Sequence, residues 1–308
     1  MKEIYVNAYG DCADNRGIYK IAINEGKLIV SQFYQLDGKS NMIINYKDYI
    51  ITSIACDDGN YLRMINKETM EIMMNVKTEY FYCYGFVMNN KLYAASFSDG
   101  VDSMFDLENF ELIKNVIHQS DLYKSVGRSH YINYIGENIL SVDNCYQQLY
   151  KYDQNLNIID IKQFEEENIR LLSDNTRNNK LYLNTEITND IIVLNKEDLS
   201  EVQRISLAPK GEGVGAVNAL SANGKYLCAS IRMPSKLCLM RVDQDGLLSI
   251  IDEAVCKDVP RDGVFADDYL LVSATNENCV QLYRIINDKL VLKDELSLSK
   301  PVTFAAIL

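Results

Sequence analysis

The chain has 308 residues, of which 47% are hydrophobic and 24% are charged, a composition typical of soluble globular proteins. Its net charge of −12 argues against nucleic acid, whose phosphate backbone needs a basic surface, and against anionic membranes. No apolar run approaches the roughly 18 residues of a membrane span, and the first residues, MKEIYVNAYGD, lack the pattern of a signal peptide. We therefore expect a cytoplasmic protein with no membrane or nucleic-acid partner.

Short segments that resemble β-strands follow one another along the whole chain. In chain order they include GIYKI, NYLRM, KLYAASF, NILSVD, KLYLNTE, KYLCASI and YLLVSAT, which are rich in Tyr, Ile, Val and Leu. Turns such as NNK, NGK, DQDG and NDK separate them. Helical periodicity is weak, and the one candidate, FEEENIRLL at 164–172, is better interpreted as a loop.

Similar windows recur about every 44 residues, which is the period of a β-propeller blade. They end near Ile21, Met64, Phe105, Tyr152, Leu194, Met240 and Tyr283. The predicted fold class is therefore all-β: a single domain over residues 1–308, built as a seven-bladed β-propeller with four-stranded antiparallel blades. Both ends of the chain, IYVNAY and VTFAAIL, are expected to be strands that share one blade and close the ring without a free edge.

Polar residues differ between the copies at equivalent ends of strands. Those expected just before a first strand are His130, Arg170 and Arg261. Those expected at the end of a second strand are Glu186, Asn144, Arg232 and Thr275. A binding or catalytic site would give this pattern, and so would ordinary variation among repeats, so spacing alone leaves both open.

Four segments, 127–153, 168–195, 220–248 and 259–285, resemble successive blades of the seven-bladed β-propeller lactonase family. That family includes a bacterial 6-phosphogluconolactonase and the fungal muconate-lactonizing cycloisomerases. GIYKIAINEGKL near the start and PVTFAAIL at the end also resemble its first and last segments. The resemblance covers essentially the whole chain and is stronger after residue 115.

The resemblance implies a site at one mouth of the propeller channel. Four residues correspond to residues of the family's motifs. His130 corresponds to the histidine of a His-x-His-like segment, Arg170 to the arginine of Pro-Arg-His, Glu186 to the glutamate of Asn-Glu-Leu and Arg261 to the arginine of Pro-Arg-x-Phe. His118 matches a further histidine just upstream. The departures bear on the substrate more than on the fold: Arg128 replaces the first histidine, Leu171 follows Arg170 where the family has histidine, and Asp143-Asn144-Cys145 replaces Asp-Leu-Gly.

The implied chemistry is hydrolysis of a sugar lactone, in which water attacks the ring carbonyl and an oxyanion develops. His130 is the natural base, because the unperturbed pKa of histidine lies near neutrality, and Glu186 could orient it or act as base. Arg170 and Arg261 could hold a phosphate or carboxylate and the oxyanion. Candidates for substrate binding are Arg128, Arg232, His118 and Asn144. Each of these residues could instead be structural, as an ion-pair partner, a packed histidine or a turn residue.

We expect a 6-phosphogluconolactonase-like hydrolase of a small anionic sugar lactone, acting without cofactor or metal as a monomer or weak homo-oligomer. The eight cysteines form no C-x-x-C motif, and two histidines are too few for a histidine-rich metal site. The glycine-rich segment KGEGVG is interpreted as a blade connection, since no strand precedes it and no helix follows it. Two alternatives stay open: another lactonase or carboxylate cycloisomerase, and a non-catalytic propeller that binds a ligand or a protein.

Overall fold

The computed structural model describes residues 2–9, 16–165, 167–300 and 302–307. These residues form 28 strands arranged in seven four-stranded sheets, and none of the residues described is in a helix. No described segment is therefore a helix that is long and apolar enough to cross a membrane. The chain forms two compact units, residues 36–170 and residues 1–35 with 171–308. The single domain expected from the sequence stays a prediction.

The unit of residues 36–170 contains three complete sheets of four consecutive strands each. The first holds β4 (Lys39–Tyr46), β5 (Tyr49–Cys56), β6 (Gly59–Asn66) and β7 (Ile72–Thr78). The second holds β8 (Tyr84–Met88), β9 (Lys91–Ser96), β10 (Val101–Asp106) and β11 (Leu112–Ile117). The third holds β12 (Ser129–Ile135), β13 (Asn138–Asp143), β14 (Gln148–Tyr152) and β15 (Ile158–Gln163).

The other unit contains four sheets, one of them made from both ends of the chain. Three of its sheets are made of consecutive strands. The first holds β16 (Ile169–Asn175), whose first two residues belong to the unit of residues 36–170, with β17 (Lys180–Thr185), β18 (Asp190–Asn195) and β19 (Glu201–Ser206). The second holds β20 (Gly215–Leu220), β21 (Tyr226–Ile231), β22 (Lys236–Val242) and β23 (Leu248–Val255), and the third holds β24 (Pro260–Ala266), β25 (Tyr269–Ala274), β26 (Cys279–Ile286) and β27 (Lys289–Ser297). The fourth has the order β28 (Val302–Ile307), β1 (Lys2–Tyr9), β2 (Arg16–Asn24) and β3 (Lys27–Gln35).

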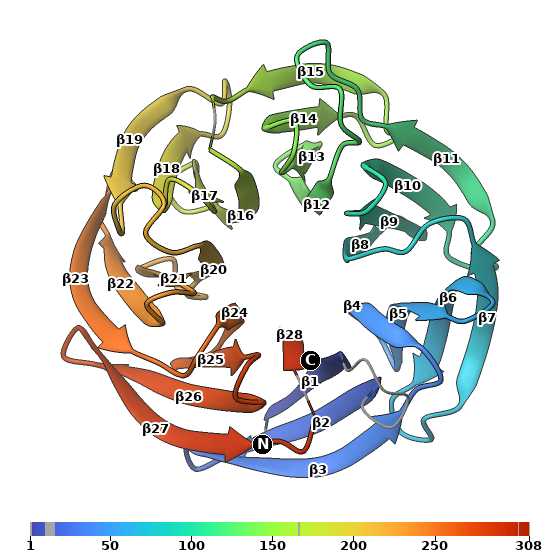
Figure 1. Ribbon diagram of the computed structural model, residues 1–308, viewed down its shortest axis with the longest axis horizontal. Helices are drawn as coiled ribbons and strands as arrows, with labels where there is room; N and C mark the ends of the chain where they lie inside the picture. The colour runs from blue at the N-terminus through green and yellow to red at the C-terminus, as the bar shows by residue number, and fades with distance from the viewer. Residues whose placement is uncertain (1, 10–15, 166, 301, 308) are drawn as a thin grey trace. The chain divides into compact units, whose positions relative to one another are not determined.

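The shared terminal blade predicted from the sequence is confirmed. β28 pairs antiparallel with β1, with Ile4 opposite Ile307 and Val6 opposite Ala305 (Figure 1). A sheet that needs the last strand to complete the first three joins the two ends of the chain by backbone hydrogen bonds. The edge of β1 that would otherwise be open is thus covered.

The repeat predicted from the sequence is also confirmed. All seven window ends fall in the third strands of the sheets, namely β2, β6, β10, β14, β18, β22 and β26. The segment 164–172 contains no helix among its described residues, but its last part is not a loop as expected, because β16 begins at Ile169. The apolar residues Ile169 and Leu172 are buried in this strand.

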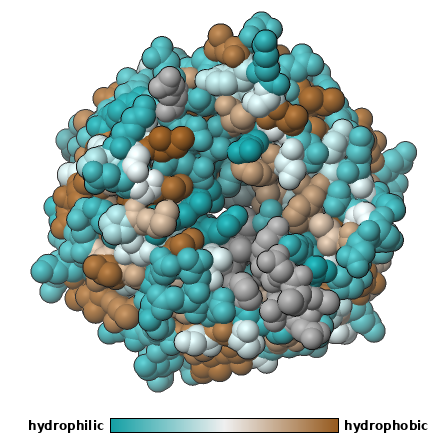
Figure 2. Space-filling model, viewed as in Figure 1, coloured by the Kyte–Doolittle hydropathy of each residue, from teal (hydrophilic) through white to brown (hydrophobic). Residues whose placement is uncertain are grey.

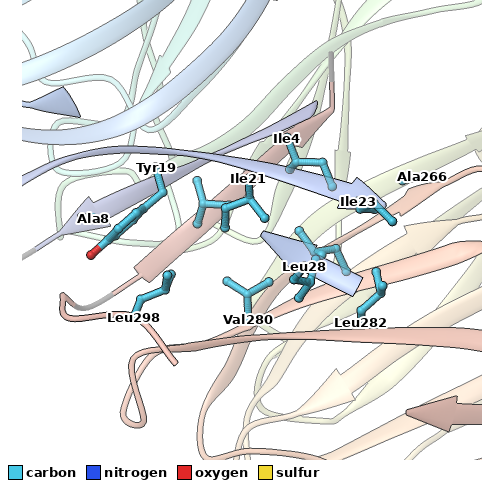
Figure 3. Close-up of a cluster of buried hydrophobic side chains, with 12 residues drawn as sticks. Ile4, Ala8, Tyr19, Ile21, Ile23, Leu28, Ala266, Val280, Leu282 and Leu298 are labelled. Atoms are coloured by element: carbon cyan, nitrogen blue, oxygen red, sulfur yellow. The ribbon is translucent and has the colours of Figure 1, made fainter. Parts of the chain in front are cut away.

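Burial separates the strands by their place in the sheet. The second strands are buried on both faces, and their sequences are short continuous apolar runs, as in β17 and β25. The fourth strands, such as β7 and β15, are largely exposed. Neighbouring sheets within a unit therefore pack through their inner strands. In one such core Ile4 and Ile21 lie against Val280 and Leu282 from the adjacent sheet (Figure 3).

Candidate functional site

Three predicted site residues occupy the same position in their sheets. His130, Arg170 and Arg261 are each the second residue of a first strand, in β12, β16 and β24. The sequence placed each of them just before the strand, and the structure corrects this, because each strand begins two residues earlier than expected. The equivalence of the three positions, which the repeat alignment predicted, is confirmed.

His130 and Arg261 each occupy a β-bulge. The register between β12 and β13 shifts between Ser129 and Tyr131, and that between β24 and β25 shifts between Pro260 and Asp262. A bulge inserts one residue that has no direct partner on the neighbouring strand, and it re-aims that side chain. Bulges are common beside active sites. This irregularity could not be predicted, because strand periodicity does not reveal where one residue is skipped.

The second set of predicted residues directly follows second strands. Asn144 follows β13, Glu186 follows β17, Arg232 follows β21 and Thr275 follows β25. Phe97 has this position after β9 and was missed. The signal was present, because KLYAASF aligns with KLYLNTE so that Phe97 corresponds to Glu186.

The ring of Phe97 contacts two predicted site residues in the unit of residues 36–170. The His130 ring meets it edge-on, with ring centroids 5.3 Å apart and an interplanar angle of 86°. The guanidinium of Arg128 lies 5.3 Å from the centroid of the same ring. Such a contact between a cation and a ring is stabilising, so Phe97 brings Arg128 and His130 together.

Asn144 and Arg170 are both buried. The side-chain amide of Asn144 donates hydrogen bonds to the backbone oxygens of Asn168, at 3.3 Å, and Ile169, at 3.0 Å. These two carbonyls directly precede Arg170. Asn144 thus fixes the start of the strand that carries Arg170, a role that the sequence interpretation, which gave it to substrate binding, did not foresee.

His118 has a fully buried side chain held between two carboxylates. Its Nδ1 lies 2.8 Å from Oδ2 of Asp143, and its Nε2 lies 2.8 Å from Oδ2 of Asp102 and 3.0 Å from the Tyr152 hydroxyl. The ring also stacks on Tyr150, with centroids 4.0 Å apart. Burial opposes the charge on His118, but the charge of Asp102 and the hydrogen bonds to both aspartates outweigh it and raise the pKa of His118 to about 9.

The complete burial of the His118 side chain argues against its predicted role in substrate binding. A side chain with no exposed surface cannot contact a ligand that arrives from solvent. The signal for a buried network was present in the sequence, because Asp102 lies within an apolar strand and Asp143 ends one, and a buried carboxylate needs a partner.

In the other unit, Glu186 and Arg232 form an ion pair. Nη2 of Arg232 donates to Oε1 of Glu186 at 2.9 Å, and the two side chains are 19% and 18% exposed. The pair joins the end of β17 to the end of β21. The glycine-rich connection predicted at 210–215 runs beside it: the amide of Gly215 donates to the backbone oxygen of Glu186 at 3.0 Å. A Cβ at Gly215 would lie 2.2 Å from the backbone oxygen of Thr185, so only glycine allows this close approach.

The seven four-stranded antiparallel sheets define the protein as a seven-bladed β-propeller. Residues 170–303 match the family model of the lactonases with a seven-bladed β-propeller, and this confirms the resemblance to that family over this part of the chain. The matched residues include Arg170, Glu186, Arg232 and Arg261. No curated protein sequence matches the chain.

Several solved structures share the fold. A protein from Lactobacillus plantarum is 17% identical, with a TM-score of 0.89 and full coverage of both chains. A Bacteroides fragilis protein provisionally named 6-phosphogluconolactonase is 18% identical, with a TM-score of 0.86 over 100% of this chain and 98% of that one. A periplasmic gluconolactonase from Pseudomonas aeruginosa is 14% identical, with a TM-score of 0.81 over 100% and 99%. At these identities the similarity shows the fold.

Proposed function

We propose that the protein hydrolyses the ring ester of an anionic sugar lactone, with 6-phosphogluconolactone as the first substrate to test. The observation that carries the proposal is the match of residues 170–303 to the lactonase family. Support comes from fold relatives whose names refer to gluconolactone or its 6-phosphate.

The reaction needs a base for water and positive charge near the carbonyl. Water forms a bond to the ring carbonyl carbon and gives a proton to the base, and the proton then passes to the ring oxygen as its bond to that carbon breaks. We assign the role of the base to His130, which lies on the bulge of β12 and contacts the ring of Phe97. An arginine beside the developing oxyanion lowers the barrier because that charge is absent from the ground state.

The ion pair separates the roles of the arginines in the unit that holds residues 171–308. Glu186 offsets the charge of Arg232 at 2.9 Å, so Arg232 adds little net attraction for an anion. Arg261 lies on the bulge at the start of β24, a position that re-aims a side chain. We assign the phosphate to Arg261, because a guanidinium carries several donors that suit an anion, and to Glu186 and Arg232 the positioning of neutral hydroxyl groups of the sugar.

We keep a cytoplasmic location as a proposal. The seven cysteines among the described residues are free thiols, which is usual in a reducing compartment. A monomer or weak homo-oligomer stays the expectation, and size measurement in solution tests it.

A second candidate is a propeller that binds a partner without catalysis. Two apolar side chains in the segment that precedes β12 favour it, because Leu122 is 71% and Val126 is 62% exposed. On the face shown in Figure 2, hydrophobic side chains lie scattered among hydrophilic ones.

The experiment is lactone hydrolysis by the purified protein, measured against the spontaneous rate. We expect faster opening of 6-phosphogluconolactone than of the unphosphorylated lactone, and Arg261→Ala should narrow the difference. Turnover of a carboxylate-bearing lactone alone would indicate another lactonase or a cycloisomerase. No acceleration with any of these substrates would reject the enzymatic proposal and favour the binding propeller.

A further inference from the structure

The segment that carries His130 is anchored to buried carboxylates. The backbone N–H of Arg128 donates to Oδ2 of Asp143 at 2.9 Å, and the hydroxyl of Ser129 donates to Oδ1 of Asp102 at 2.6 Å. The next residue, His130, is the bulge. Two successive residues before the bulge are thus fixed by side chains from β10 and from the end of β13.

His118 joins the two carboxylates that make these anchors. Its two ring nitrogens each lie 2.8 Å from a carboxylate oxygen, one on Asp102 and one on Asp143. All three side chains are fully buried. Two carboxylates without a cation between them would repel each other in a medium that screens charge poorly, so His118 is what allows both to stay in place.

The backbone is also shaped for this contact. A Cβ at Gly127 would lie 2.7 Å from Oδ2 of Asp143 and 3.2 Å from the Cβ of His118. Gly100, at a φ of +60°, lies directly against Gly127, because a Cβ there would be 2.5 Å from the Gly127 carbonyl carbon. Both glycines allow the segment to lie on the network at closer range than any other residue permits.

We propose that His118 is a positioning residue, which acts with Asp102 and Asp143 to clamp Arg128 and Ser129 so that the bulge presents His130 in one fixed orientation. The effect on turnover rests on the proposed lactonase function, whereas the effect on the orientation of His130 does not. His118 therefore acts through the backbone of the segment and does not touch the substrate.

The test uses the fact that the chain has only two histidines. In protein labelled with ¹³C at histidine Cε1, the two ring signals report on His118 and His130 separately, and His118→Phe assigns them. The main variant is Ser129→Ala, which removes one anchor and keeps the charges of the network. Ser103→Ala is the matched control, because Ser103 is also a buried serine in this unit. Its hydroxyl donates at 2.7 Å to Oδ1 of Asn115, which lies outside the network.

We expect Ser129→Ala to shift the His130 signal and to lower kcat about tenfold with little change in KM, because a small misplacement of a reacting group costs rate more than binding. Ser103→Ala should do neither. Equal effects of the two variants on the His130 signal, or none from either, would overturn the proposal. If the wild-type protein opens no lactone, the proposed function fails, and the shift of the His130 signal alone still decides whether the clamp exists.

Discussion

The bulges of β12 and β24 hold the same place in their sheets but are held by different chemistry. Each skips one residue at the start of a first strand, His130 in one and Arg261 in the other. The groups that hydrogen-bond to the segment before His130 include buried, charged carboxylates. The groups that hydrogen-bond to the segment around Arg261 are mainly neutral hydroxyl and backbone groups.

The support of the β24 bulge consists of several ordinary hydrogen bonds. The Ser230 hydroxyl donates to the backbone oxygen of Pro260 at 3.0 Å, and the amide of Thr275 donates to the backbone oxygen of Val259 at 3.1 Å. The amide of Val259, which has a φ of +58°, donates to the Ser235 hydroxyl at 3.2 Å. Each such bond contributes about 1 kcal/mol, and none depends on a buried charge.

The difference shows how one repeat can present two kinds of functional group. A histidine that acts as a base works only in a narrow range of orientation, which a charged clamp can enforce. An arginine that binds an anion tolerates more variation, because its long side chain carries several donors. Substitutions at the two bulges should therefore differ in their effects on activity, on stability and on the pH dependence of stability.

The largest effect on activity is expected from substitution of the two bulge residues, His130 and Arg261. His130→Ala should lower kcat by about 10²- to 10⁴-fold, the range for loss of a general base. Arg261→Ala should mainly raise KM for the phosphorylated lactone, by about 10- to 100-fold, for loss of a hydrogen bond to a charged group. Steady-state kinetics on both variants would show the split. Equal losses on phosphorylated and plain lactone for Arg261→Ala would contradict its assigned role.

His118→Phe should be the most destabilising change in the charged clamp. Phenylalanine can still stack on Tyr150 but leaves Asp102 and Asp143 buried without their cation, which should cost about 3–5 kcal/mol in the free energy of unfolding. Urea unfolding measures this. A loss below about 1 kcal/mol, the value for one neutral hydrogen bond, would show that the network is not charged.

The clamp also predicts a dependence of stability on pH. The pKa of His118 is raised to about 9 in the folded protein, so its contribution is complete below the unfolded value near 6.5 and disappears as the pH rises through 9. The loss across this window is about 3 kcal/mol. The groups facing His118 are Asp102, Asp143, Tyr150 and Tyr152, and burial raises the pKa of both tyrosines, which therefore stay protonated. Unfolding measured from pH 6 to 10 in wild type and His118→Phe should show the extra fall only in the wild type.

The smallest effect is expected at the neutral bulge. Ser230→Ala removes the hydroxyl that donates to the backbone oxygen of Pro260 and accepts from the amide of Val217, so it should cost about 1–2 kcal/mol. The cost should be the same at pH 7 and pH 9, as measured by urea unfolding. A cost that changes with pH would remove the contrast between the two bulges.

Much of the fold could be predicted because each repeat has the same local pattern of apolar strands and polar turns. The window ends such as Tyr152 and Tyr283 fall in third strands, and the two terminal segments pair as expected. The equivalence of His130, Arg170 and Arg261 followed from the same alignment.

The supports of the site could not be predicted in the same way. Asp102, His118 and Asp143 meet through loops and strands of two different sheets, and no local period records such a meeting. The bulges at His130 and Arg261 depend on how one strand pairs with another. Side-chain contacts such as Glu186 with Arg232 depend on packing between neighbouring sheets.

The most direct test of the account is the hydrolysis of 6-phosphogluconolactone by the wild-type protein and by His130→Ala, each measured against the spontaneous rate. We predict clear acceleration by the wild type and its loss in His130→Ala, with both proteins folded. Acceleration that is equal in the two proteins, or absent from the wild type, would contradict it.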